Sequence, residues 1–303
     1  MATIYYDDNA DLTTLQDLIL GVVGYGNQGR AHALNLRDSG LNVLVGTRAG
    51  SHAKDVAIED GFVPLDIAEV ARRSDLIALL LPDEQAPLVY NQSIGPNLTK
   101  PTGFVFAHGF VVHHQSVKLA EDADVILVAP TGPGRQLRSL YQDGAGLPAL
   151  VAVERNTSGK AWERCLAYAR AIGCTRAGAI KTTFAEETIT DLFCEQAVLC
   201  GGLPELIKAS FDTLVARGYQ RELAYISCLK EVKLIADLLF SRGVDGMRAS
   251  ISNTAKYGSA IAGPEIINSA TCHALSGILE RIETGEFASQ SLADIDNGSE
   301  MTN

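Results

Sequence analysis

The sequence lacks long hydrophobic runs, an excess of positive charge and closely paired cysteines, and each absence excludes a class of protein. No apolar stretch reaches the roughly 18 residues that a membrane-spanning helix needs, so we expect no membrane partner. The formal net charge is −11 over 303 residues. Such a chain repels phosphate backbones, so nucleic acid is not an expected partner either.

The six cysteines all lie in the second half of the chain, and none forms a CxxC pair. The start of the sequence, Met1 to Asp11, is polar and acidic and does not resemble a signal peptide. We therefore expect reduced, mostly buried thiols in a cytoplasmic protein. The length is sufficient for two domains of ordinary size.

Short apolar runs alternate with amphipathic stretches in the first half, a pattern typical of βαβ units around a parallel sheet. The expected strands are Leu18–Val23, Asn42–Val45, Leu76–Leu81, Phe104–Phe106, Val125–Val128 and Leu147–Val153. Arg30–Ser39 and Ile67–Arg72 are expected to be helices. We predict an α/β Rossmann domain over residues 1–182.

Strand alternation stops after Thr182, and long helical patterns follow. They are Glu187–Cys200, Leu203–Arg217, Gln220–Ser241 and Pro264–Thr284. Residues 183–303 are therefore predicted to form an all-α domain. The segment after Glu286 is rich in Ser, Asp and Asn and is expected to fray.

A GxGxxG motif follows the first expected strand and opens a helix, the context in which this motif is specific for dinucleotide binding. Its residues are Gly24, Tyr25, Gly26, Asn27, Gln28 and Gly29. The first glycine permits the tight turn, the second lets the backbone approach a pyrophosphate, and the third lets the helix pack against the strand. The free N–H groups of the helix would bind the phosphates.

The end of the second strand indicates which dinucleotide binds. NAD sites usually carry an acid there, and this chain has none. Arg48 can pair with a 2′-phosphate and Ser51 can hydrogen-bond to it, while His52 and Lys54 add further donors. The pattern favours NADPH and leaves NADH possible.

Ten ordered motifs between Tyr5 and Glu286 resemble one family. They are Tyr5–Asp7, Gly24–Gly29, Leu81–Glu84, Phe106–Phe110, Val128–Pro130, Gly132–Gly134, Thr175–Gly178, Glu186–Thr188, Thr190–Phe193 and Glu195–Gly202. On these motifs the chain resembles short-chain ketol-acid reductoisomerase. That family makes the dihydroxy acids of branched-chain amino-acid synthesis, using magnesium for an alkyl migration and NADPH for a reduction. The resemblance implies a knotted helical domain, a homodimer and an active site that draws on both subunits.

The resemblance also implies an acidic metal site. Asp191 and Glu195 are spaced i,i+4 and share a helix face, and their oxygens suit Mg²⁺. From the spacing alone, a solvated acidic face is the commoner explanation. The family's second acidic pair matches Ser227 and Glu231 here, and Ser252 matches the serine that contacts the substrate carboxylate.

The chain departs from the family at several of these positions. Ser227 replaces one of the four acids, and Thr131 replaces the lysine of the family's Pro-Lys-Gly loop. Near Ser252, Asn253 and Lys256 replace two further acids. Alkyl migration needs two oxygens polarised together, which metal ions and a nearby cation do well. We therefore expect the isomerase step to be lost and the reduction to be kept.

The residues that a reduction needs are present in the sequence. Those expected beside the cofactor are Leu81, Pro82, His108, Pro130 and Gly134. His108 would relay a proton or hold the substrate; the alternative is a structural loop histidine. His32 is expected on a helix surface near the phosphates, and His113 and His114 as a solvated pair.

The sequence leaves the small-molecule substrate open between a cyclic imine and a plain 2-keto acid. With either one, Asp191, Glu195 and Glu231 would act as acids, since a carboxylate among carboxylates can hold and donate a proton near neutrality. Two rival functions remain. One is an authentic reductoisomerase converting 2-acetolactate to 2,3-dihydroxyisovalerate, and the other is a non-catalytic NADPH-binding regulator.

Overall fold

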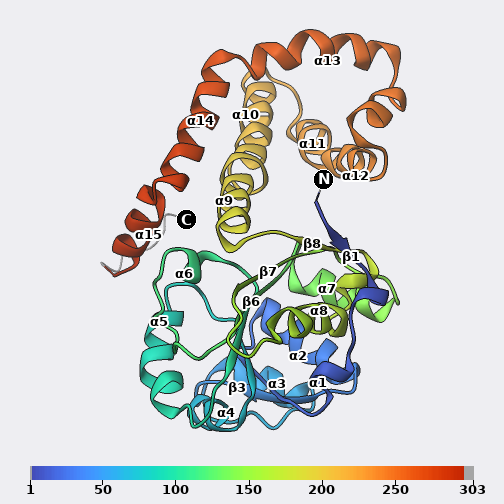
Figure 1. Cartoon of the computed structure of the whole chain (residues 1–303). Helices are drawn as coiled ribbons and strands as arrows, with labels where there is room; N and C mark the ends of the chain where they lie inside the picture. Colours follow the sequence, from blue (N-terminus) through green and yellow to red (C-terminus); the bar gives the residue numbers. More distant parts are fainter. Residues whose placement is uncertain (1, 297–303) are drawn as a thin grey trace. The chain divides into compact units, whose positions relative to one another are not determined.

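A computed structural model describes residues 2–296 of the chain, which fall into two compact units (Figure 1). The first unit comprises the described residues up to Thr188 together with those from Leu292 onwards. The second runs from Ile189 to Ser291. The first is α/β and the second is helical, so the predicted fold class is confirmed.

The first unit is built on one eight-stranded sheet with the order β1-β8-β7-β6-β5-β4-β2-β3. The strands are β1 (Ile4–Tyr5), β2 (Ile19–Val23), β3 (Asn42–Gly46), β4 (Leu76–Leu79), β5 (Gly103–Phe106), β6 (Val125–Pro130), β7 (Ala149–Arg155) and β8 (Ala179–Lys181). Each of the six strands expected from the sequence is present. Strands β1 and β8 were not expected, because two or three residues are too few to show alternation.

The sheet is parallel from β3 to β6 and contains two antiparallel pairings, which corrects the expectation of a wholly parallel sheet. Strand β7 runs antiparallel to β6, and β1 runs antiparallel to β8. Strand β2 lies between β3 and β4, so the chain reverses its direction of progress across the sheet there. In open α/β sheets, ligands bind beyond the carboxyl ends of the strands at such a point.

Helices cover the sheet and bury its apolar residues. They are α1 (Thr13–Gln16), α2 (Asn27–Asp38), α3 (His52–Glu59), α4 (Ile67–Arg73), α5 (Ala86–Val89), α6 (Phe110–His113), α7 (Gly134–Gln142) and α8 (Ala161–Ala171). Turns η1 (Asp7–Asn9), η3 (Gly95–Asn97) and η4 (Cys174–Arg176) are 3₁₀, and η2 (Tyr90–Ile94) is π-helical. Helix α2 packs against α7 and α8, while α4 packs on β2 and β3.

Helix α2 begins three residues earlier than predicted, at Asn27, because the glycine motif itself forms its first turn. Helices α1, α3, α5, α6, α7 and α8 were not predicted. Helix α3 begins where the hydroxyl of Ser51 accepts a hydrogen bond from the Lys54 N–H. The capping serine was identified in the sequence only as a phosphate ligand.

The second unit consists of helices joined by short turns (Figure 1). They are α9 (Phe184–Cys194), which begins in the first unit, η5 (Glu195–Leu199), α10 (Gly202–Ala216), α11 (Arg221–Tyr225), η6 (Ile226–Lys230), α12 (Val232–Ala249), α13 (Asn253–Ile266), α14 (Ser269–Glu283) and α15 (Glu286–Asp296). Turns η5 and η6 are π-helical. No helix among the described residues is long and apolar enough to cross a membrane.

Three expectations for this region are wrong. The segment Gln220–Ser241 is interrupted by the π turn η6. Pro264 lies within the end of α13 instead of starting a helix. The described part of the tail after Glu286 forms α15 instead of fraying, while residues 297–303 lie outside the described part of the chain.

Candidate active site

The glycine motif forms a tight turn between β2 and α2. Gly24 has a φ of 96°, a left-handed conformation that favours glycine. A Cβ at Gly29 would lie 2.0 Å from the carbonyl oxygen of Gly24, so the helix meets the turn backbone to backbone. A Cβ at Gly26 would meet no atom within 4 Å, so the backbone there is open to a ligand.

A second glycine loop docks on the start of α2. The side-chain amide of Gln28 donates to the carbonyl of Gly132 at 2.9 Å, and the Arg135 N–H donates to the side chain of Asn27 at 3.1 Å. A Cβ at Gly134 would lie 2.0 Å from the carbonyl oxygen of Asn27. Helices α2 and α7 therefore begin side by side, and Asn27 and Gln28 brace the loop that follows Pro130 at the end of β6.

Thr131 opens this second loop. Its hydroxyl donates to the carbonyl of Pro148 at 3.0 Å, and its backbone N–H donates to the same oxygen at 2.9 Å. The position where the family has a lysine therefore carries a neutral side chain that is hydrogen-bonded to the segment just before β7.

A cavity of about 200 Å³ lies at the carboxyl ends of β2, β3 and β4. The residues around it that the sequence predicted are Gly24, Tyr25, Gly26, Arg48, Ser51, Leu81 and Pro82. No residue lining it is acidic. The open backbone at Gly26, the helix start and the exposed Arg48 fit a dinucleotide phosphate.

His108 lies in the loop after β5 and is held by Glu187 of α9. Its Nδ1 lies 3.0 Å from Oε1 of Glu187, and the Gly109 N–H donates to Oε2 at 2.7 Å. The Glu187 carboxylate is only 3% exposed, and both its oxygens accept hydrogen bonds from this loop. Sequence reasoning missed Glu187; an acid four residues before Asp191 on the same expected helix was the available signal.

The other histidines depart from expectation. His32 is fully buried, not on a helix surface, because α2 packs against α8, where the His32 ring lies 3.0 Å from the Tyr168 hydroxyl. Burial lowers the pKa of His32 to about 3, so it is neutral at pH 7. His113 and His114 are not a fully solvated pair. The His114 ring packs 4.7 Å from that of Phe110, and burial, followed by the charges of His113 and His108, lowers the pKa of His114.

The cysteine expectation is partly wrong for the single chain. Cys165 and Cys174 are buried, and burial raises the pKa of both thiols. Cys194, Cys200 and Cys272 are exposed in the helical unit. All six cysteines are free.

The acidic residues lie along α9 and further into the helical unit. A carboxylate oxygen of Asp191 lies within 4.8 Å of one of Glu187, one turn earlier. Glu195 follows at the start of the π turn η5, and Ser227 lies within the π turn η6. Such turns recur at functional sites.

Glu231 and Ser252 lie in the helical unit, where the single chain leaves both exposed. The hydroxyl of Ser252 accepts the Ala255 N–H at 3.2 Å and caps α13. Asp191 and Glu195 supply carboxylate oxygens of the kind that Mg²⁺ prefers. Ser227 supplies a hydroxyl where the family has a carboxylate, so the residues fit a metal site only in part.

Two family models match nearly the whole chain. Residues 14–178 match the acetohydroxy acid isomeroreductase NADPH-binding domain, and residues 184–303 match the ketol-acid reductoisomerase C-terminal domain.

One solved structure gives the same assignment, and a second shares the fold. An NADH-preferring ketol-acid reductoisomerase from an uncultured archean is 42% identical, with a TM-score of 0.94 over 98% of this chain and 91% of its own. A semialdehyde dehydrogenase NAD-binding protein from Cupriavidus necator, solved with calcium and NAD, shares only the fold. It is 17% identical, with a TM-score of 0.69 over 89% of this chain and 99% of its own. The chain therefore belongs to the ketol-acid reductoisomerase family and is an NAD(P)H-dependent oxidoreductase.

Proposed function

We propose that this enzyme is a diverged member of its family that reduces an imine or a 2-keto acid and no longer performs the alkyl migration. The observation that carries the proposal is the hydrogen bonding of the Thr131 side chain. Its hydroxyl is neutral and donates to the Pro148 carbonyl, so this loop position offers no cation to a substrate. Ser227 removes a second charge from the site that the family uses.

The two half-reactions differ in what they need from the protein. Alkyl migration shifts charge between two neighbouring oxygens, and cations that hold both oxygens lower its barrier. Hydride transfer needs an aligned acceptor and a proton source. The losses at Thr131 and Ser227 therefore affect the migration more than the reduction.

The chain retains residues suited to the reduction. NADPH supplies the hydride when bound. His108 is oriented by Glu187, which accepts the Nδ1 hydrogen bond and can stabilise the imidazolium form, so proton exchange with the substrate falls to Nε2. The hydrogen bond from Gly109 fixes the carboxylate in turn. The arrangement supports His108 as general acid and Glu187 as the group that positions it.

The preferred cofactor is NADPH. Arg48 is exposed beside the cavity, and α3 begins a few residues later with its free N–H groups at the same loop. A cation and a helix N-terminus both favour a 2′-phosphate. The similar archaeal enzyme is described as NADH-preferring, so NADH remains the alternative for this chain.

Asp191 and Glu195 are the residues that would hold Mg²⁺, which would polarise a substrate oxygen. With Ser227 in place of an acid, we propose that catalysis does not depend on the metal. Asp191, Glu195 and Glu231 then serve as proton-carrying groups, and Ser252 contacts the substrate carboxylate.

The partner that the helical unit fits is a second copy of the chain. The described parts of α10, α12 and α13 contain no buried residue. Large apolar side chains are exposed there, including Leu206, Leu234, Phe240, Val244, Tyr257 and Ile261. A cluster of exposed apolar side chains over several helices marks an interaction surface.

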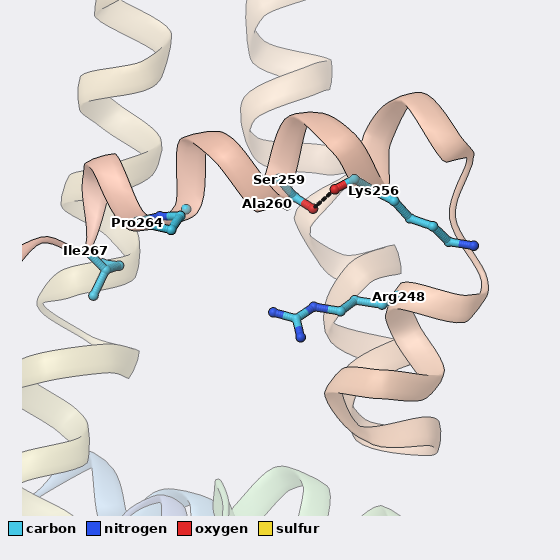
Figure 2. Close-up of a pocket in the computed structure, with 7 residues that line it drawn as sticks. Arg248, Lys256, Ser259, Ala260, Pro264 and Ile267 are labelled. Atoms are coloured by element: carbon cyan, nitrogen blue, oxygen red, sulfur yellow. Dashed lines mark hydrogen bonds between the residues drawn. The ribbon is translucent and has the colours of Figure 1, made fainter.

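A hollow of about 790 Å³ lies between α12 and α13 (Figure 2). Pro264 and Ile267 line it, and Arg248 of α12 extends beneath α13. We expect a dimer at micromolar concentration by light scattering. Phe240 is 95% exposed, so Phe240→Asp should shift the mass towards the monomer, whereas Ile58→Asp on α3 should not.

The second candidate function is the complete reductoisomerase reaction. It is favoured by the 42% identity to the archaeal enzyme and by the retained acids Asp191 and Glu195.

NADPH oxidation with 2-acetolactate, cyclic imines and simple 2-keto acids, each with magnesium and with EDTA, tests the proposal. Turnover of an imine or keto acid that resists EDTA is expected. Rapid magnesium-dependent turnover of acetolactate would support the second candidate instead. Tight NADPH binding with no turnover of any of these compounds would indicate a non-catalytic regulator.

A further inference from the structure

The carboxylate of Asp60, the residue that ends α3, binds the chain on both sides of the glycine turn. Its Oδ2 accepts a hydrogen bond from the Tyr25 hydroxyl at 2.9 Å. The Arg30 guanidinium donates to both oxygens, from Nε to Oδ2 at 2.7 Å and from Nη2 to Oδ1 at 2.8 Å. Such a two-pronged pair is strong and fixes its own geometry. Tyr25 precedes Gly26 and Arg30 follows Gly29, so one carboxylate holds the whole turn.

The Asp60 side chain is well suited to hold these two partners. It is only 13% exposed, and the hydrogen bonds from Arg30 lower the pKa of its carboxyl group, so it is charged at pH 7. Tyr25 is buried, at 5% exposed. Without Asp60, the Tyr25 hydroxyl would be left buried without its acceptor, which costs more than an exposed hydrogen bond does.

The far end of α2 is attached to the same segment. Arg37, in the last turn of α2, donates from Nη1 to the Asp60 carbonyl at 2.6 Å. Its guanidinium carbon lies 4.6 Å from the centre of the Phe62 ring. The Phe62 ring in turn meets the Tyr25 ring edge-on, with centres 5.8 Å apart. Helix α2 is therefore held to the residues that follow α3 near both of its ends.

Helix α3 thereby links two walls of the cavity of about 200 Å³. Tyr25 and Gly26 of the glycine turn line the cavity, as do Arg48 and Ser51 of the loop before α3. Ser51 caps the start of α3, and Asp60 ends it eight residues later. One short helix is thus anchored to the loop at its first residue and to the turn at its last.

We infer that Asp60 is a positioning residue for the dinucleotide, which holds the glycine turn in its binding conformation before the cofactor arrives. The inference rests on the proposed use of this cavity by the dinucleotide. Asp60 does not itself line the cavity, so it acts through Tyr25 and Arg30. A site that is already ordered binds more tightly, because binding does not have to order it. The turn faces the part that NADPH and NADH share, so Asp60 supports both cofactors equally.

Equilibrium titration of the full chain with NADPH and with NADH, followed by nucleotide fluorescence without substrate, tests the inference. Asp60→Asn keeps the volume and removes the charge. It should weaken both cofactors about tenfold and leave the ratio of their affinities unchanged. Asp60→Glu keeps the charge and should restore both affinities to within about threefold of the wild type. Tyr25→Phe should weaken both cofactors about three- to fivefold, and adding it to Asp60→Asn should cause little further loss.

Asp38→Asn is the matched control. Asp38 also lies on α2 and also pairs with an arginine, Arg138 at 2.6 Å, but it lies at the end of the helix away from the turn. It should leave both affinities unchanged. Arg48→Ala provides the contrast, since it should weaken NADPH more than NADH.

Wild-type affinities in Asp60→Asn would overturn the inference and leave the proposed function intact. So would an equal loss in Asp38→Asn, or a loss in Asp60→Asn that is confined to NADPH. Binding of neither cofactor by the wild type would overturn both the inference and the proposed use of the cavity. If Asp60→Asn does not fold, Tyr25→Phe decides, and unchanged affinities in that variant contradict the inference.

Discussion

Oε1 of Glu187 lies 3.0 Å from Nδ1 of His108, although the two residues are 79 positions apart in the chain. The carboxylate comes from α9 and the imidazole from the loop after β5. A buried carboxylate at Nδ1 sets the tautomer and the direction of the ring, and it stabilises the ring when protonated. The pair therefore forms the centre of the proposed reduction.

Glu187→Gln should lower kcat about tenfold or more with a reducible substrate, because the amide keeps the volume but loses the negative charge that supports the imidazolium. The affinity for NADPH should be unchanged. Steady-state kinetics together with cofactor titration separate the two quantities. Glu186→Gln is the matched control, since Glu186 is exposed and accepts a hydrogen bond from the Thr182 hydroxyl. Equal losses of kcat in both variants would show that Glu187 has no specific role in supporting His108.

Restoring the two charges that the chain lacks should restore the isomerase step. The double variant Thr131→Lys with Ser227→Glu should gain magnesium-dependent formation of the dihydroxy acid from 2-acetolactate. The rate should be at least about tenfold above that of either single variant. The reason is that the lysine adds a cation and the glutamate adds a magnesium ligand, and both help to polarise the two substrate oxygens during alkyl migration. Chromatographic product analysis measures the gain. Cofactor titration confirms that the variant is folded, and a folded variant without any gain would argue against the assigned cause of the loss.

Strong local signals in the sequence predicted the fold class, six strands and the glycine turn. The glycine motif needs a left-handed Gly24 and a side-chain-free Gly29, so its geometry follows from the residues alone. What the sequence could not show depends on contacts between distant segments. Helical spacing does not reveal that Glu187 reaches His108, or that α8 covers His32. The loss of charge at Thr131 was visible in the sequence, whereas its bond to Pro148 was not.

The burial of His32 predicts a pH-dependent stability. Its pKa falls from an ordinary 6.5 to about 3 in the folded chain, because burial disfavours the charged form. Below pH 6.5 the unfolded chain binds a proton at His32 that the folded chain does not bind. The contribution of neutral His32 to the free energy of unfolding is therefore complete above pH 6.5 and is lost as the pH falls towards 3. The loss should approach about 2 kcal/mol between pH 6.5 and pH 4.5.

Urea unfolding at several pH values measures that loss. His32→Phe should flatten the pH dependence over this window, whatever its stability at pH 7. His273→Gln, at an exposed histidine, should leave it unchanged. A His32→Phe variant with the wild-type slope would show that other groups titrate there.

Gln115 follows α6 with a φ of 53°, a backbone conformation that is strained for residues with a side chain. Gln115→Gly should stabilise the protein by about 0.5–1 kcal/mol, because relief of strain exceeds the added freedom of the unfolded chain. Gln136→Gly, within α7, should instead destabilise it by up to about 1 kcal/mol. Denaturant midpoints compare the two, and destabilisation by Gln115→Gly would contradict the assignment of strain.

We propose that this enzyme reduces its substrate but does not isomerise 2-acetolactate. The most direct measurement compares NADPH oxidation by the wild type on 2-acetolactate and on the 3-hydroxy-2-keto acid that alkyl migration would produce from it, both with magnesium present. Reduction of the rearranged acid, with acetolactate at least about a hundredfold slower, is the predicted result. Equal turnover of the two compounds would show that the enzyme still performs the migration and would contradict the proposed loss of the isomerase step.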